Sequence, residues 1–224
     1  MCNLYAPESP QKISMRFAVA APIEPYGPTV APLKPGPIVI AGGALVAQWG
    51  LIPPQSPTRV PMLSSGQRMS TNNCRRERMV TANTFRDAWR NGQRCIIPAV
   101  SYDEPCWETG KNVWWRFQRA DGEAWALAGL WSQWTDPQTG EIVPSFTMIT
   151  QNCDGHPLLA RMHKPDPKLA PDKQDKRCPV PLTPQVWDQW FHGSVEDAQS
   201  LITLPVVELF KAGPVEKSAQ ASLL

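Results

Sequence analysis

The sequence predicts a single α+β domain with a largely antiparallel, barrel-like β-sheet core and short flanking helices. Many short apolar segments carry the pattern of β-strands, and turn residues separate them. Prolines number 25 among 224 residues, about twice the usual share. Because proline ends helices and cannot donate a hydrogen bond within a sheet, the elements should be short. A chain of this length can bury a core without a disulfide or a metal ion.

Three strands and two short helices are expected in the N-terminal half. The proline-rich first 35 residues should form a surface loop around the first helix, and residues 55–72 a second loop. Gly42-Gly43 between the first two strands predicts a hairpin, and Thr84 is the expected N-cap of the second helix. The expected strands are 38–40, 44–49 and 94–100, and the expected helices are 11–17 and 83–91.

Three strands and two helices are expected in the C-terminal half. Asp121-Gly122 between the first two strands predicts a second hairpin. Pro184 should begin one helix, and Ser194 with Asp197 should begin the next. The domain should span 2–212 and be followed by a flexible tail over 213–224. The expected strands are 113–117, 124–130 and 145–150.

Composition and the N-terminus exclude several classes of protein. No apolar run reaches the length of a membrane span, and residues 1–5 do not resemble a signal peptide. We therefore expect a cytoplasmic protein with no membrane partner, whose six cysteines remain thiols. Neither the cysteines nor the three histidines show the spacing of a zinc site, so no metal ion or other cofactor is expected.

Cys2 follows the initiator methionine, which is normally removed when the second residue is small. The mature chain would then begin with a cysteine that carries two nucleophiles on adjacent carbons. Its α-amine, with an ordinary pKa of about 7.7–8.0, can attack an aldehyde to give a Schiff base, and its thiol can then close a thiazolidine ring. The alternative is that position 2 merely tolerates any small residue.

Residues 68–94 form a cationic segment with seven arginines and two acids, a local balance of +5, whereas the whole chain has +2. Arginine without lysine favours bidentate contact with phosphate or carboxylate. Within this segment Asn73, Arg75 and Glu77 alternate and would face one side of an extended strand. A solvated charged surface is the alternative explanation for such a run.

Glu104 and His163 are candidates for proton transfer. Glu104 follows the expected strand over 94–100, where its carboxylate could line a cleft with a raised pKa or lie in an exposed loop. His163 could shuttle protons or be a hydrogen-bonded structural group. Spacing alone does not distinguish His163 from His156.

Several short blocks stand in a fixed order along the chain, namely Met1-Cys2, 49–53, 73–77, 94–99, Glu104, 128–131, 145–150 and 161–163. This order is the one seen in the SOS-response-associated peptidase (SRAP) family, which the chain resembles from residue 2 to about residue 191. The resemblance implies a single α+β domain that binds single-stranded DNA and links its N-terminal cysteine covalently to abasic sites in the response to DNA damage. It also implies that the protein removes its own Met1.

The resemblance assigns roles to individual residues. Cys2 would form the thiazolidine with the ring-opened sugar aldehyde, and Asn73 would hold the Cys2 amine or the sugar. Glu104 would assist ring opening and proton transfer, and His163 would contact the sugar and assist the Schiff-base chemistry. Arg75 would hold a phosphate. The residues expected to contact DNA are Arg68, Arg75, Arg76 and Trp49.

The chain departs from the family pattern at three places. Asn3-Leu4-Tyr5 replaces the common Gly-Arg-Phe, which removes an arginine that could contact DNA. Pro105 replaces the tryptophan that usually follows the glutamate, so other aromatic residues, Trp49 among them, would have to supply a stacking surface. Residues 164–176 form an insertion, which we expect to be a loop beside the site.

The leading hypothesis is therefore a monomeric enzyme that crosslinks itself to abasic sites in single-stranded DNA. The first alternative is an N-terminal-nucleophile hydrolase or peptidase in which Cys2 attacks an amide carbonyl. The second is a non-catalytic nucleic-acid-binding module that keeps Met1 and binds phosphate through its arginines.

Overall fold

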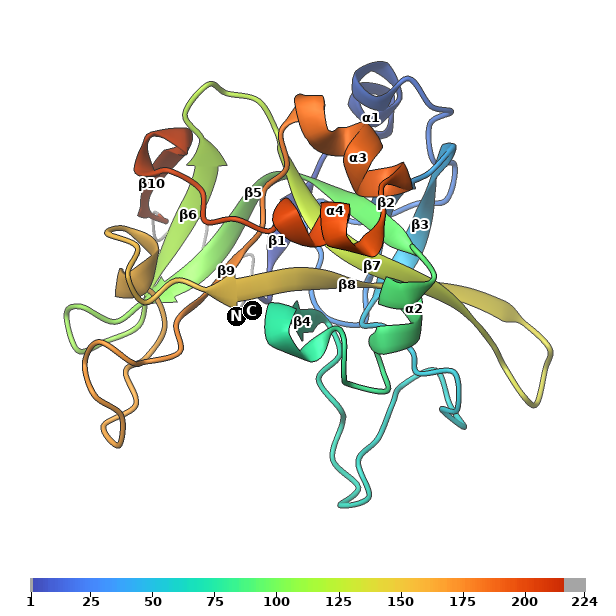
Figure 1. The fold of residues 1–224 in the computed structure, drawn as a ribbon, viewed down its shortest axis with the longest axis horizontal. Coiled ribbons are helices and arrows are strands. Elements are labelled where there is room, and N and C mark those ends of the chain that lie inside the picture. Colours follow the sequence, from blue (N-terminus) through green and yellow to red (C-terminus); the bar gives the residue numbers. More distant parts are fainter. Residues whose placement is uncertain (1, 216–224) are drawn as a thin grey trace.

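The computed structural model describes residues 2–215, and a closed five-stranded β-barrel lies at its centre (Figure 1). The barrel closes because its strands pair in the ring β2-β3-β8-β7-β5, and β5 returns to β2. The β3–β8 pair is parallel, and the other four pairs of the ring are antiparallel. The expected α+β fold with a barrel-like sheet is confirmed. The barrel strands are β2 (Pro35–Ile40), β3 (Gly43–Trp49), β5 (Arg94–Cys106), β7 (Trp125–Thr135) and β8 (Ile142–Asn152).

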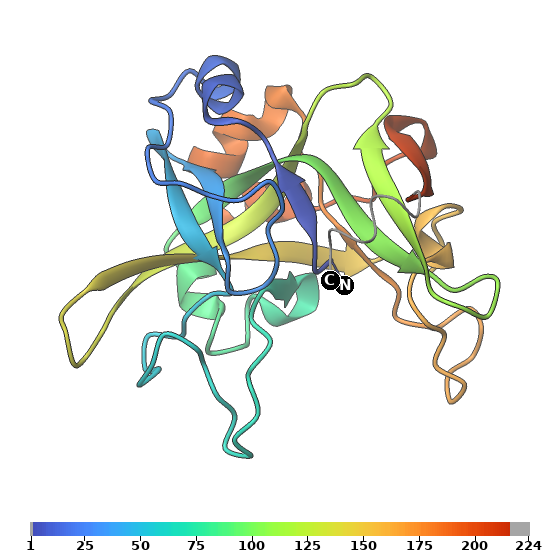
Figure 2. The same ribbon diagram turned by 180° about the vertical axis from the view of Figure 1, so that it is seen from behind.

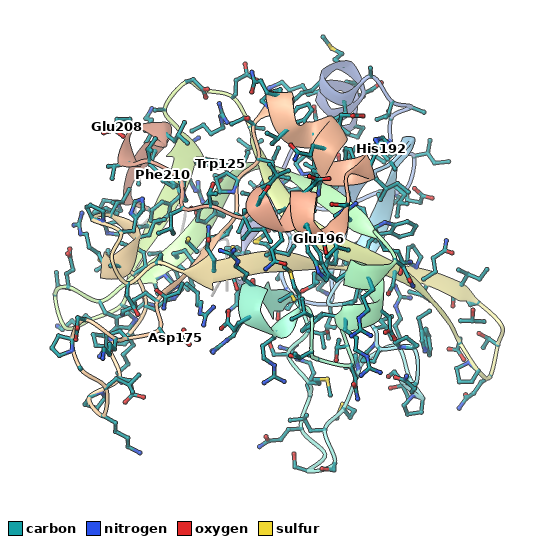
Figure 3. All side chains as sticks on the ribbon, viewed as in Figure 1. Trp125, Asp175, His192, Glu196, Glu208 and Phe210 are labelled. Carbon is teal, nitrogen blue, oxygen red and sulfur yellow. The ribbon has the colours of Figure 1, made fainter. Side chains whose placement is uncertain are left out.

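Further strands extend the barrel at its edges. β1 and β6 pair with the second half of β5, β10 pairs with β6, and β4 and β9 pair with β8. Phe210 of β10 packs on Trp125, with ring centroids 5.2 Å apart (Figure 3). These strands are β1 (Tyr5–Pro7), β4 (Asn73–Arg75), β6 (Val113–Arg119), β9 (Arg177–Pro179) and β10 (Phe210–Pro214).

The helices are short, and α1, α3 and α4 gather on one side of the barrel in both views (Figures 1 and 2). Ser194 and Asp197 cap α4 reciprocally, as expected. Within residues 2–215 no helix is long and apolar enough to cross a membrane. The α-helices are α1 (Pro10–Phe17), α2 (Arg86–Arg90), α3 (Trp187–His192) and α4 (Val195–Ser200), and the 3₁₀ turns are η1 (Arg76–Arg78), η2 (Leu159–Arg161), η3 (Pro184–Val186) and η4 (Val207–Leu209).

Alternation along the barrel strands separates the two large clusters of the core, because successive side chains of a strand point to opposite faces. A third, small cluster consists of Ile52, Trp134 and Val143. Val39 and Ile96 belong to the cluster that includes buried residues of all four α-helices. Their neighbours Ile38 and Ile97 belong to the other cluster, which therefore fills the barrel interior. Cys2 lies in this interior cluster.

One predicted hairpin is confirmed and the other is wrong. Gly42 adopts a φ of +82° in the turn that joins β2 to β3. The turn at Asp121-Gly122 exists, but β6 and β7 do not pair with each other. They pair instead with successive stretches of β5, namely residues 102–106 and 94–99. A turn signal fixes a local reversal of the chain, whereas the partner of each strand depends on the 13-residue β5.

Three predicted boundaries also change. Residues 5–7 form a strand rather than a surface loop, because they pair with β5. The N-cap of α2 is Phe85 rather than Thr84, whose hydroxyl contacts the sulfur of Met69 instead. Gly213 and Pro214 lie in β10, so the predicted tail begins too early. Residues 216–224 of that predicted tail lie outside the described residues.

Candidate active site

Strand β1 determines the position of Cys2. It pairs antiparallel with β5 so that Tyr5 lies opposite Tyr102, and the Asp103 amide donates a hydrogen bond of 3.1 Å to the Leu4 carbonyl. Continuing this register toward the N-terminus brings Cys2 alongside Glu104 and Pro105. Cys2 is completely buried there.

Two consecutive asparagines anchor the Cys2 backbone. The Asn73 side-chain amide donates to the Cys2 carbonyl at 2.7 Å. The Asn72 side-chain amide donates to the same carbonyl at 3.4 Å and to the Asn3 side chain at 3.0 Å. Asn73 is held by strand β4, which runs parallel to β8 and places Asn73 opposite Met148. The Asn73 Oδ1 atom is buried, and none of the described residues donates to it. The amide therefore holds Cys2 with its NH₂ group and presents a second polar atom, which can accept a hydrogen bond, within the same buried region.

Glu104 lies within β5, opposite Trp115 of β6, and not in a loop after the strand. Its side chain is 3% exposed. Burial disfavours the charged carboxylate and raises the pKa of Glu104 from 4.5 to about 7. Of the two alternatives open from the sequence, a buried carboxyl with a raised pKa is the correct one.

His163 packs against Glu104. Its Nε2 atom lies 3.5 Å from Glu104 Oε2 and 3.2 Å from the Arg177 carbonyl oxygen. Because a carbonyl only accepts, this partner assigns the ring proton to Nε2. The His163 amide also donates to the Pro105 carbonyl at 2.6 Å. His163 has a φ of +64°, a left-handed conformation that turns the chain just before the insertion.

Burial also sets the protonation states of the other groups. It lowers the pKa of His163 to about 3, so the imidazole is neutral at physiological pH. It raises the pKa of the Cys2 thiol well above its usual value, and the nearby Glu104 raises it further. The thiol donates to the Leu4 carbonyl at 3.5 Å. Cys2 is therefore a protonated thiol that needs a base before its sulfur can attack.

His156, the other histidine that spacing left open, lies elsewhere in the structure. Its Nδ1 atom accepts from the amides of Leu158 and Leu159, and its Nε2 atom lies 2.9 Å from the Pro205 carbonyl. These bonds hold the turn before η2 together. His156 is thus a structural group, and His163 is the histidine beside Glu104.

The residues expected to contact DNA fall into different environments. Trp49 is completely buried and donates from Nε1 to the Asn72 carbonyl at 2.8 Å. A buried indole offers no face to a base, so the expectation that Trp49 stacks on DNA is not retained. Arg76 donates to the Ile202 carbonyl at 3.1 Å, which ties η1 to the chain after α4. Arg68 is exposed on the long loop before β4.

Arg75 shares a cleft with one of the catalytic candidates. It is exposed and lines a cleft of about 260 Å³, and Asn73, which holds Cys2, lines the same cleft. The cleft therefore adjoins the asparagine that holds the Cys2 backbone, and a guanidinium group lines it. The lining residues are Ser70, Asn73, Arg75, Glu77, Arg78 and Phe85.

Among residues 2–215 no group of three or more His, Cys, Asp or Glu side chains could hold a metal ion. The candidate site instead combines a thiol, an amide, a carboxyl and an imidazole, from Cys2, Asn73, Glu104 and His163. These four side chains come from the N-terminus, β4, β5 and the start of the insertion, and the fold brings them together.

A comparison with models of protein families identifies the family of this chain. A family model for the SOS response associated peptidase (SRAP) matches residues 1–221. The chain belongs to the SRAP family. The resemblance read from the sequence motifs is thereby confirmed.

Solved structures resemble this SRAP chain over almost its whole length. A protein of Bordetella bronchiseptica is 30% identical, with a TM-score of 0.83, and the match covers 96% of this chain and 100% of that one. A protein of Bacteroides thetaiotaomicron (19% identity, TM-score 0.79, 98% and 94% covered) and a phage-related protein of Bordetella bronchiseptica (15%, 0.63, 96% and 94%) share the fold. No match is found among curated proteins.

Sequence reasoning missed three residues that support the candidate site. Asn72 bonds to the Asn3 side chain and accepts from Trp49, and the Asn72-Asn73 doublet was a signal for it. Lys176 donates from Nζ to the His163 carbonyl at 2.6 Å, and Arg177 offers its carbonyl to the His163 ring. Lys176 and Arg177 lie 13 and 14 residues after His163, so no local pattern could connect them to it.

Proposed function

We propose that the protein forms a covalent thiazolidine crosslink between Cys2 and the aldehyde of an abasic site in single-stranded DNA, after Met1 has been removed. The observation that supports this most directly is the placement of Cys2 beside an asparagine and a Glu104–His163 pair, in a buried site that adjoins the arginine-lined cleft. Membership of the SRAP family supports a function in DNA processing and the SOS response.

The chemistry requires both nucleophiles of Cys2. While Met1 is attached, the Cys2 nitrogen is an amide and cannot attack an aldehyde. Once it is free, the amine adds to the C1′ aldehyde of the opened sugar and loses water to form an imine. The thiol then adds across the C=N bond, with sulfur to carbon and the proton to nitrogen. One water molecule leaves, and nothing is oxidised or reduced.

Glu104 is the acid and base of this sequence. With a pKa of about 7, it is present in both protonation states near neutral pH. The protonated form donates to the sugar ring oxygen as the ring opens and to the hydroxyl that leaves as water. The ionised form accepts the proton from the Cys2 thiol, whose own pKa is too high for spontaneous ionisation.

The other residues position the reactants. His163 stays neutral and acts on the sugar as a hydrogen-bonding group rather than as a cation. The Asn73 NH₂ group fixes Cys2 by donating to the Cys2 carbonyl, and the Asn73 Oδ1 atom accepts from the freed amine. Arg75, at the cleft beside Asn73, holds a phosphate of the DNA strand.

The experiment that tests the proposal incubates the purified protein with a single-stranded oligonucleotide that contains one abasic site. Intact mass first establishes whether Met1 is absent. We expect an adduct that survives denaturing electrophoresis without a reductant, with the mass of protein plus DNA minus one water. Preparations that retain Met1 should form none.

Cys2→Ala tests the role of sulfur. After removal of Met1 this variant keeps a free N-terminal amine, so its imine should be trapped by borohydride but should not survive denaturation alone. Cys74→Ala is the matched control, because Cys74 is a buried thiol on the helix side of the barrel. An unchanged adduct yield in Cys2→Ala would refute the mechanism. Turnover of amide substrates without any aldehyde would support the hydrolase alternative instead.

A further inference from the structure

The insertion after His163 is tied to strand β4 by a chain of four charged side chains. Arg75 Nη1 lies 2.8 Å from Asp175 Oδ2. Arg177 contacts the other oxygen of Asp175, and it also donates to Glu77 Oε2 at 2.8 Å. Figure 3 shows Asp175 near the loop that leads into β9. The order of contacts is therefore Arg75, Asp175, Arg177 and Glu77.

The four side chains have no net charge together, so the positive charge of Arg75 is balanced within this group. Arg75 and Arg177 contribute two positive charges, and Asp175 and Glu77 contribute two negative charges. The guanidinium beside the cleft is thus paired with a carboxylate. Asp175 comes from the insertion, 100 residues after Arg75, and so lies outside the cationic segment over 68–94.

The backbone holds the Asp175 carboxylate in place. The amides of Asp175 and Lys176 both donate to the Asp154 side chain, at 3.0 and 2.8 Å. Asp175 has a φ of +54°, a left-handed conformation that aspartate and asparagine adopt more readily than most residues. The pair itself is partly exposed, with 43% of the Arg75 side chain and 36% of the Asp175 side chain accessible. Exposed ion pairs of this kind contribute little stability, so an incoming anion can displace the carboxylate.

We propose that Asp175 competes with a DNA phosphate for Arg75, so that the insertion lowers the affinity of the protein for single-stranded DNA. The proposal rests on the phosphate contact of Arg75 in the proposed function. A phosphate that approaches Arg75 must displace Asp175 or bind beside it, and like charges at that distance repel each other. Asp175 is therefore an affinity-determining residue contributed by the insertion, and it does not take part in the chemistry.

The test measures binding of a fluorescent single-stranded oligonucleotide without an abasic site, by anisotropy. Asp175→Asn keeps the left-handed backbone, because asparagine tolerates positive φ. We expect its dissociation constant to fall roughly three- to tenfold, as one arginine becomes available for a phosphate. The slope of log Kobs against log salt should steepen by about 0.7, the value for one further phosphate contact on a single strand.

Two comparisons separate competition from a general charge effect. Asp172→Asn removes the same charge from an exposed position of the same insertion and should leave the affinity unchanged. In an Arg75→Gln background, Asp175→Asn should not increase the affinity for single-stranded DNA. The proposal would be overturned by an increase in affinity that is equal with and without Arg75, by an increase of the same size in Asp172→Asn, or by no increase in Asp175→Asn. Because adduct formation is assayed separately on the wild-type protein, failure of the crosslinking chemistry is distinguishable from failure of this competition.

Discussion

Burial of the Glu104 carboxyl should make the stability of the protein depend on pH in a direction opposite to that of most acids. The pKa of Glu104 rises from 4.5 to about 7 because its charged form is desolvated. Between these values the folded state binds the Glu104 proton and the unfolded state does not. The free energy of unfolding supplied by this group is therefore fully present below pH 4.5 and decreases as pH rises through 7.

The size of the effect follows from the two pKa values. Each increase of one in a pKa corresponds to about 1.4 kcal/mol, so the change from 4.5 to about 7 corresponds to about 3 kcal/mol lost between pH 4.5 and pH 8. Glu104→Gln replaces the carboxyl with a neutral group of the same shape, which does not titrate. We expect the variant to match the wild type near pH 4.5 and to exceed its stability by up to about 3 kcal/mol at pH 8.

Urea unfolding at pH 5 and at pH 8 measures this difference. The quantity of interest is the stability of Glu104→Gln minus that of the wild type at each pH, because other titrating groups then cancel. Glu141→Gln, at an exposed position of the loop before β8, is the control and should show no pH-dependent difference. If the difference for Glu104→Gln were the same at both pH values, the buried carboxyl would not have the raised pKa, and its role as acid and base would fail with it.

Glu104→Gln should also form the crosslink at least about 100-fold more slowly than the wild type, the usual range for loss of an acid–base group. The inflection near pH 7 in the pH dependence of the wild-type rate should disappear. Crosslinking at the wild-type rate, measured on denaturing gels, would remove Glu104 from the mechanism. Asn73→Ala loses the 2.7 Å bond to the Cys2 carbonyl and should cost about 1 kcal/mol of stability, which urea unfolding measures. It should also slow crosslink formation about tenfold, as followed on timed gels; an unchanged rate would contradict this. Ser194→Ala breaks the capping box of α4 and should lower the free energy of unfolding by about 1 kcal/mol, or the melting temperature by about 2–4 °C. Its crosslinking rate should equal that of the wild type, because α4 packs in the other core cluster from Cys2. A slower rate would contradict this separation of α4 from the site.

The sequence predicts features that depend on neighbouring residues better than features that depend on segments distant in the chain. The β2–β3 hairpin and the start of α4 depend on neighbouring residues, namely Gly42-Gly43 and the Ser194–Asp197 box, and both are confirmed. The partners of β6 and β7 depend on the length of β5, which no turn signal reports. Pairing between segments distant in sequence is set by the whole barrel, so the second predicted hairpin is wrong.

The candidate site shows the same division. The sequence alone was enough to single out Cys2, Asn73, Glu104 and His163, because each has a side-chain chemistry that is unusual for its position or belongs to a family motif. The tertiary structure decided their protonation, since the pKa values of Glu104 and His163 are set by burial among residues from β5, the insertion and β9. It also decided the role of Trp49, which supports Asn72 from inside the barrel.

The charged residues show most clearly what the sequence determines and what the tertiary structure determines. The sequence by itself determines that seven arginines and two acids lie between residues 68 and 94, because counting needs no coordinates. Only the tertiary structure decides that Arg75 is paired with Asp175 and that Arg76 bonds to the Ile202 carbonyl. The physical reason is that electrostatic interactions depend on distance in space, and folding brings to the two arginines partners that lie 100 and 126 residues away in the chain.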